Sequence, residues 1–422
     1  MRHLKIFLII AIAATSLMVA FSYPHTQVVE VASSQEQPSI PHPAPAFSVL
    51  DKLHEGDDLL IATPLKVGTK DIPYKEVRIN RDGSKTTTTN QKFAEPEKEI
   101  ALKLLNLETG DIDIAVITKR GADLISPSNY KIEVMERSSG IRWNKWNTHF
   151  RVIEPSNWIV LKNKYPEISY ENVKKQVKNK AGKLQTVTVR QQVVEEIIYS
   201  PYSDDLHLPE LVDGGKEYID SVVASAQAEL IRFGVKSRTL PDQLVGALEV
   251  LPARFFKRIP LLEQSDLGEF VLDPQKTADR VRVIIKLNAE RAYSLTCSKA
   301  NACGWVQFTP KTYQAIRKAY PLAKLDSDFE RGAANHLNSM KAAILLYDYN
   351  LQGFVSRHGK SILYDPRLEE YLAAGYNGRP TTASASLKAA ISKGLGDWTQ
   401  KLKLETKGFM TKLRYLQGED AS

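Results

Sequence analysis

The chain of 422 residues is long enough for two or three domains, each with its own hydrophobic core. Its 43% hydrophobic and 25% charged residues are typical of a folded soluble protein, and they exclude collagen-like, largely disordered and multi-span membrane proteins. The net charge of +8 suits a polyanionic partner, and the presence of only two cysteines excludes a disulfide-rich scaffold.

Residues 1–22 are predicted to be a secretory signal peptide. Arg2 and Lys5 precede an uncharged apolar run over residues 6–21, and Ala20 and Ser22 are small residues at the positions that signal peptidase reads. The run is short for a membrane span, which needs about 20 residues, so we favour cleavage over a retained anchor. In both cases the rest of the chain is expected outside the cytoplasm, in the periplasm or at the cell surface. Nucleic acid is therefore not an expected partner.

Residues 23–48 are predicted to form a proline-rich linker with few side chains to bury. Residues 49–204 are predicted to form a β-rich domain. Ile112, Ile114 and Val116 alternate with other residues in one of its predicted strands.

Two hairpins are predicted in this region. The Arg-Asp-Gly sequence at residues 81–83 separates two short strand-like runs, and residues 180–183 are expected to close a second, longer hairpin that includes Val187 and Val189.

Three tryptophans, Trp143, Trp146 and Trp158, also lie in the β-rich domain. We expect them to pack in a core rather than to stack on sugars. The domain itself could bind a partner protein in the cell envelope.

Residues 205–422 are predicted to form an all-α domain, so the fold class is α+β and multidomain. Apolar residues recur every three or four positions, which predicts one long helix with these residues on one face: Phe329, Ala333, Leu337, Met340, Ile344, Tyr347 and Leu351. Thr309 before Pro310, and Asp365 before Pro366, are each typical of an N-cap followed by proline at the first helical position.

Glu290 is a candidate general acid. Val283, Leu287 and Glu290 would share one face of a helix over residues 279–293. A carboxyl group beside apolar neighbours should have a raised pKa, as a general acid near neutral pH requires. The alternative is a helix-end glutamate that points to water.

The sequence after Glu290 resembles the soluble lytic transglycosylase domain of the goose-type lysozyme-like superfamily. That family has a loop of the type Ser-x-x-Gly-Ala-x-Gly-Leu-Met-Gln after its catalytic glutamate, and the matching positions are Ser298, Ala302, Gly304 and Gln307. Residues 373–378 resemble the family's Ala-Tyr-Asn-x-Gly element, and residues 404–406 resemble its terminal Glu-Thr helix. The motifs together span residues 290–416.

The resemblance implies cleavage of peptidoglycan glycan strands between N-acetylmuramic acid and N-acetylglucosamine, with no cofactor. Glu290 would protonate the leaving oxygen and then act as base on the muramic 6-hydroxyl, which gives a 1,6-anhydro end. Ser298, Gln307, Tyr376, Asn377 and Glu405 would contact the substrate or support the acid.

Two related functions stay open. Simple muramidase hydrolysis is the near alternative. Arg291, Asn301, Trp305 and Val306 depart from the family pattern, so a non-catalytic glycan-binding or scaffold protein with a degenerate lysozyme-like domain is the second alternative.

Cys297 and Cys303 flank the loop and are predicted to form a disulfide in an oxidising compartment. The competing hypothesis is a cysteine nucleophile activated by His336 or His358. No metal site is predicted, because the eight histidines are scattered and show no ligand spacing. Residues 54–58 (His-Glu-Gly-Asp-Asp) are expected to form a solvated turn.

Overall fold

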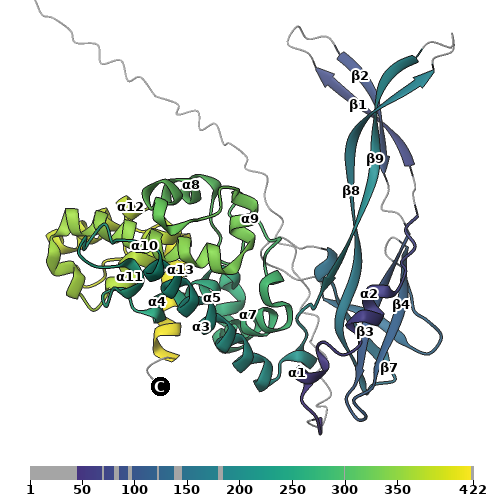
Figure 1. Ribbon diagram of the computed structural model, residues 1–422, viewed down its shortest axis with the longest axis horizontal. Coiled ribbons are helices and arrows are strands. Elements are labelled where there is room, and N and C mark those ends of the chain that lie inside the picture. The colour runs from purple at the N-terminus through teal and green to yellow at the C-terminus, as the bar shows by residue number, and fades with distance from the viewer. Residues whose placement is uncertain are drawn as a thin grey trace, which may run out of the picture. The chain divides into compact units, whose positions relative to one another are not determined.

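The computed structural model describes most of the chain after residue 44, with strands in the first half and helices in the second (Figure 1). The described ranges are 45–68, 71–79, 85–93, 97–120, 123–136, 145–178, 184–298 and 300–419. The predicted signal peptide, nearly all of the linker, both predicted hairpin turns and Trp143 lie outside them.

A five-stranded antiparallel sheet with the order β5-β4-β3-β8-β9 forms the centre of the first half. Its strands are β3 (Lys98–Asn106), β4 (Ile112–Arg120), β5 (Asp123–Ile125), β8 (Trp158–Lys178) and β9 (Leu184–Tyr199). The alternation over Ile112, Ile114 and Val116 correctly predicted β4. β3 is almost entirely buried because its side chains pack into two apolar clusters, Ile100, Leu102 and Leu104 into one and Leu105 into the other.

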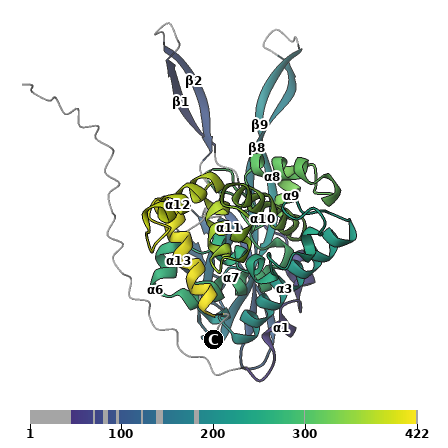
Figure 2. The same ribbon diagram turned by 90° about the vertical axis from the view of Figure 1, so that its left-hand side faces the viewer.

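Both predicted hairpins are present as antiparallel pairs (Figure 2). β1 (Asp71–Ile79) pairs with β2 (Lys85–Phe93), and Ile79 lies opposite Lys85 next to the turn. β8 pairs with β9 over the full length of β9, from Asn163 opposite Tyr199 to Lys178 opposite Leu184.

A second small sheet, β6 (Lys131–Glu136) with β7 (His149–Glu154), contributes to the same core. Trp146 is buried and packs edge-on against Tyr199, and Trp158 packs against Tyr130. The prediction of core packing is therefore confirmed for these two tryptophans.

The solvated turn that the sequence suggested over residues 54–58 is present at residues 54–56, but Asp57 and Asp58 belong to a helix. Asp57 begins α2 (Asp57–Ala62) after α1 (Val49–Lys52), and its carboxylate pairs with Lys103 and Lys162, both at 2.5 Å. Both lysines are buried in the sheet, where an ammonium group needs a partner. The aspartate therefore holds the short helix on the sheet.

Helices replace strands after Tyr199, close to the boundary predicted at residue 205. They begin with η2 (Asp204–Leu206), α3 (Pro209–Arg232), η3 (Val245–Ala247), α4 (Ala253–Lys257), α5 (Ile259–Gln264), α6 (Leu267–Leu272), α7 (Pro274–Asn288) and η4 (Ala289–Arg291). They continue with α8 (Pro310–Ala319), η5 (Pro321–Ala323), α9 (Phe329–Ala334), α10 (His336–His358), η6 (Lys360–Tyr364), α11 (Leu368–Asn377), α12 (Pro380–Lys393) and α13 (Leu404–Glu419).

Two details of the helix prediction are wrong. The single long helix is divided at Asn335, which ends α9 and caps α10 with its side chain. Asp365 is not an N-cap, because α11 begins at Leu368 after Arg367. Thr309, by contrast, caps α8 as predicted, with its hydroxyl accepting from the Thr312 amide.

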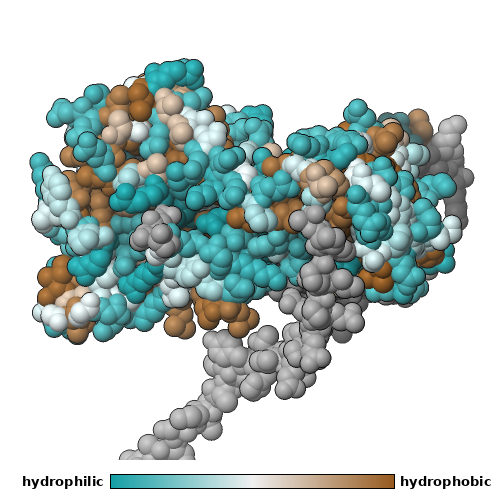
Figure 3. Space-filling view, turned by 90° about the horizontal axis from the view of Figure 1, so that it is seen from below, coloured by the Kyte–Doolittle hydropathy of each residue, from teal (hydrophilic) through white to brown (hydrophobic). Residues whose placement is uncertain are grey.

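The helical part packs around the central helix α10, which is buried over most of its length. A second apolar cluster joins the two halves of the chain: Leu105 and Leu161 of the sheet pack with Leu211 of α3 and Leu287 of α7. The face of the molecule seen in Figure 3 is largely hydrophilic, with apolar groups among the polar ones. Among the described residues, no helix combines the length and apolar character needed to cross a bilayer.

Candidate functional site

The loop after Glu290 is closed by the predicted disulfide between Cys297 and Cys303. Both thiols are consumed, so the hypothesis of a cysteine nucleophile is wrong. Ser298 closes the turn inside this loop: its hydroxyl accepts from the Ala302 amide at 3.1 Å. Asn301 has a φ of 58°, a conformation that glycine adopts freely and asparagine tolerates. This explains how asparagine can occupy the position where the family has glycine.

Glu290 does not have the sheltered position that the sequence predicted. α7 ends at Asn288, Ala289 has a φ of 47°, and Glu290 lies on a 3₁₀ turn in which no residue is buried. Glu290 is exposed, unlike Val283 and Leu287 on the preceding helix, which are buried. Apolar burial of its carboxyl group is therefore excluded.

Burial and the charge of Glu290 raise the pKa of Tyr218 of α3, whereas Glu290 is not among the groups that raise the pKa of Tyr376. The Tyr218 hydroxyl pairs with His336 Nδ1 at 3.1 Å, and His336 Nε2 pairs with the Ala292 carbonyl at 2.7 Å. The Trp305 ring stacks on His336 with centroids 4.1 Å apart. Burial lowers the pKa of His336 to about 4, so the histidine is neutral and serves this packing.

A different glutamate meets the predicted requirements for a general acid. Glu263 is the penultimate residue of α5, after the buried residues 259–262. Its side chain is half-buried, and among the described residues it makes no hydrogen bond or ion pair. Burial raises the pKa of Glu263, Lys412 lowers it and the charge of Glu405 raises it, with a net pKa of about 8. The carboxyl group is thus protonated near neutral pH and has solvent access.

Tyr376 and the motif loop converge on this glutamate. The Tyr376 hydroxyl donates to the Val306 carbonyl at 2.6 Å, and the charge of Glu263 contributes to the raised pKa of Tyr376. Gln264, the next residue of α5, donates to the carbonyls of Gly304 and Trp305 at 3.1 and 3.0 Å. The loop is therefore attached directly to the turn that carries the acid.

The remaining predicted residues occupy three different settings. Gln307 donates to the Gly304 carbonyl at 2.8 Å, so its amide supports the loop. The Asn377 Oδ1 atom is buried and has no hydrogen-bond partner among the described residues, which leaves an acceptor for a ligand. Glu405 is exposed at the start of α13, and its charge reaches Glu263.

Trp305 and Val306, at the positions where the resemblance would place a Leu-Met pair, are both fully buried. Trp305 Nε1 donates to the Ser339 hydroxyl at 2.8 Å, so the larger side chain is accommodated in the core. Since Val306 binds Tyr376 through its backbone carbonyl, the substitution leaves this contact in place.

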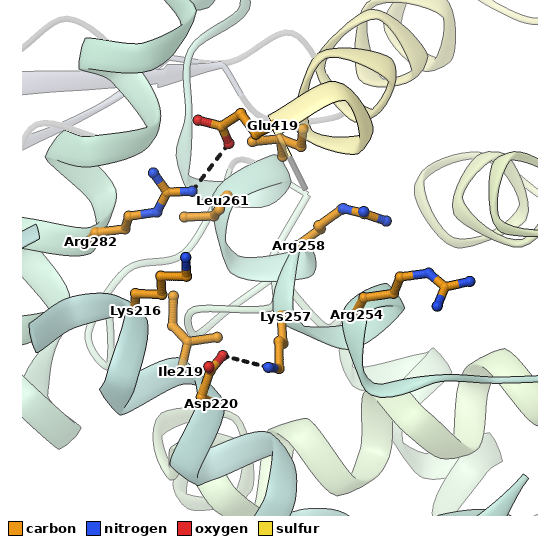
Figure 4. Close-up of a pocket in the computed structure, with 10 residues that line it drawn as sticks. Lys216, Ile219, Asp220, Arg254, Lys257, Arg258, Leu261, Arg282 and Glu419 are labelled. Atoms are coloured by element: carbon orange, nitrogen blue, oxygen red, sulfur yellow. Dashed lines mark hydrogen bonds and ion pairs between the residues drawn. The ribbon is translucent and has the colours of Figure 1, made fainter. Parts of the chain in front are cut away.

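A separate pocket of about 470 Å³ lies between α3, α4, α5, α7 and α13 (Figure 4). Leu261 borders this pocket. Glu263 lies two positions further along α5, and side chains two positions apart on a helix point to nearly opposite sides, so Glu263 faces away from the pocket. Both of its carboxylates are ion-paired: Asp220 with Lys257 at 2.9 Å and Glu419 with Arg282 at 3.2 Å. The pocket therefore offers no carboxyl group for acid catalysis.

No family model, curated protein or solved structure matches this chain. Within the described ranges, no group of three or more histidine, cysteine, aspartate or glutamate side chains is arranged to hold a metal ion.

Glu263 is not evident from periodicity, because α5 is a six-residue helix and is too short to show a helical period. The sequence does carry one indication of Glu263, because the apolar run of residues 259–262 is followed by a glutamate, the same pattern that makes Glu290 a candidate.

Proposed function

We propose that the chain is an exported peptidoglycan lytic transglycosylase whose catalytic acid is Glu263. The observation that carries the proposal is this half-buried carboxyl group with a raised pKa, which has no ion-pair partner in the described part of the chain and adjoins the loop and the tyrosine of the family motifs. The disulfide suits an oxidising compartment outside the cytoplasm.

The proposed reaction uses one glutamate twice. Protonated Glu263 gives its proton to the glycosidic oxygen as positive charge develops at the anomeric carbon. The resulting carboxylate then takes a proton from the muramic 6-hydroxyl, whose oxygen attacks the anomeric carbon and closes the 1,6-anhydro ring. The buried Asn377 Oδ1 would accept a hydrogen bond from the sugar or its peptide, while Tyr376 fixes the loop beside the acid.

A muramidase reaction is the second candidate, and Glu405 is the observation that favours it. Hydrolysis needs a base for water or a nucleophile in addition to the acid. Glu405 is an exposed carboxylate whose charge is felt at Glu263. Glu405→Gln should nearly abolish activity if the enzyme hydrolyses the bond, and it should retain most activity in the transglycosylase reaction.

The test is clearing of peptidoglycan in a gel by Glu263→Gln, Glu290→Gln and the parent protein. We expect clearing by the parent and Glu290→Gln, and a loss of at least 100-fold in Glu263→Gln. Equal clearing by the parent and Glu263→Gln would overturn the role of Glu263. Absence of clearing by all three would favour a glycan-binding scaffold.

A further inference from the structure

α13 places a buried lysine directly behind the turn that carries Glu263. Lys412 is only 6% exposed. Its ammonium group donates to the carbonyl of Leu262 and, at 2.9 Å, to the carbonyl of Ser265. These carbonyls come one residue before and two residues after Glu263, so one side chain holds the backbone on both sides of the acid.

The position of Lys412 also suits the end of a helix. The last carbonyls of a helix have no partner within it, and they carry the negative end of its dipole. A cation at this point satisfies them both. Lys412 bonds to the backbone, and Glu263 makes no ion pair with any residue that the structure describes, so the carboxyl group stays available while the positive charge remains nearby.

The charges around this pair are asymmetric. Glu405 and the hydroxyls of Tyr376 and Tyr347 interact with Glu263, and Asp266 interacts with Lys412. Near Tyr347, Arg258 and Glu369 form an ion pair, so their opposite charges largely cancel. Lys412 is therefore the cation that lowers the pKa of Glu263 against the effects of burial and of Glu405.

We propose that Lys412 is a positioning residue for the reaction: it fixes the turn that carries Glu263 and stabilises the glutamate in its ionised form, between proton donation and proton recovery. The inference rests on the proposed function of Glu263. A charge that favours the state formed during the reaction over the neutral ground state accelerates the step.

The first experiment measures kcat/KM on isolated glycan strands as a function of pH. The variants are Lys412→Met, Lys412→Arg and the control Lys407→Met, which removes another lysine of α13. Loss of the Lys412 charge makes Glu263 harder to ionise, so Lys412→Met should move the alkaline limb upward by about one pH unit and lower the rate at least tenfold. Lys412→Arg should keep the position of the limb, and Lys407→Met should behave as the parent.

A purely structural role gives a different result. If Lys412→Met lowers activity with the alkaline limb unmoved, or changes neither, the proposed electrostatic role is wrong. If Glu263→Gln is as active as the parent, the proposed function itself fails. An inactive Glu263→Gln together with an unmoved limb in Lys412→Met overturns only the inference about Lys412.

A second measurement covers the case in which Lys412→Met does not fold. Coupling between two groups is reciprocal, so the ionised glutamate must raise the pKa of Lys412. In protein labelled with ¹³C-lysine, the Lys412 resonance, assigned with Lys412→Arg, should titrate at lower pH in Glu263→Gln than in the parent. Identical titration in the two proteins would overturn the inference.

Discussion

The attachment of the motif loop to the helical core can be tested at one glycine. Gly304 has a φ of 77°, and a Cβ atom there would lie 2.1 Å from the Ala333 carbonyl oxygen. That oxygen belongs to the backbone of α9 and cannot rotate away. Gly304→Ala should therefore incur the left-handed backbone cost of about 1 kcal/mol and a further roughly 2–3 kcal/mol of overpacking.

Gly394 provides a matched control. Its φ is 61°, but a Cβ atom there would meet no atom within 4 Å. Gly394→Ala should therefore lose only about 1 kcal/mol of the free energy of unfolding. Urea denaturation of both variants, with activity measured beside it, separates the two costs. Equal losses in the two variants would refute the packing argument, as would full activity in Gly304→Ala, because the displaced loop carries the carbonyls that bind Gln264 and Tyr376.

Three further predictions concern stability. Replacing Cys297 and Cys303 by alanine should cost about 2 kcal/mol, the entropy of a short closed loop, and should lower activity; unchanged thermal unfolding and activity would contradict this. Arg258→Met leaves the buried Glu369 carboxylate without the guanidinium group that binds both of its oxygens, and it should lower the free energy of unfolding in urea by roughly 3–5 kcal/mol. The double variant Arg258→Met/Glu369→Gln should recover part of this loss. The pKa of Glu263 is raised in the folded protein, so its contribution to the free energy of unfolding falls as the pH rises from the ordinary pKa of 4.5 to about 8. Glu263→Gln should therefore become increasingly more stable than the parent across that pH range. A constant difference in stability between the two proteins would contradict the raised pKa.

Local patterns predicted much of the fold. Alternation identified β4, turn residues identified both hairpins, and Thr309 marked the start of α8. These signals depend on residues close together in the chain, which local physics governs. The sequence predicted the bounds of the described helices less well. Asn335 ends α9 and caps α10, but it does not interrupt the apolar stripe from which one long helix is predicted.

The site was predicted only in part. The order of the motif residues located the loop, the disulfide and Tyr376, all of which the sequence carries directly. The sheltered position expected for Glu290 is not present, because it required a helix that continues to residue 290, whereas α7 ends at Asn288 and Ala289 leaves helical geometry. Lys412 could not be foreseen, because it reaches Glu263 from 149 positions along the chain through tertiary packing alone.

Mass spectrometry of muropeptides released from purified sacculi tests the central claim most directly. The parent protein and Glu290→Gln should release products that are lighter by one water than hydrolysis products, and Glu263→Gln should release none. Anhydro products from Glu263→Gln at the parental rate, or their loss in Glu290→Gln alone, would contradict the assignment of Glu263 as the proton donor.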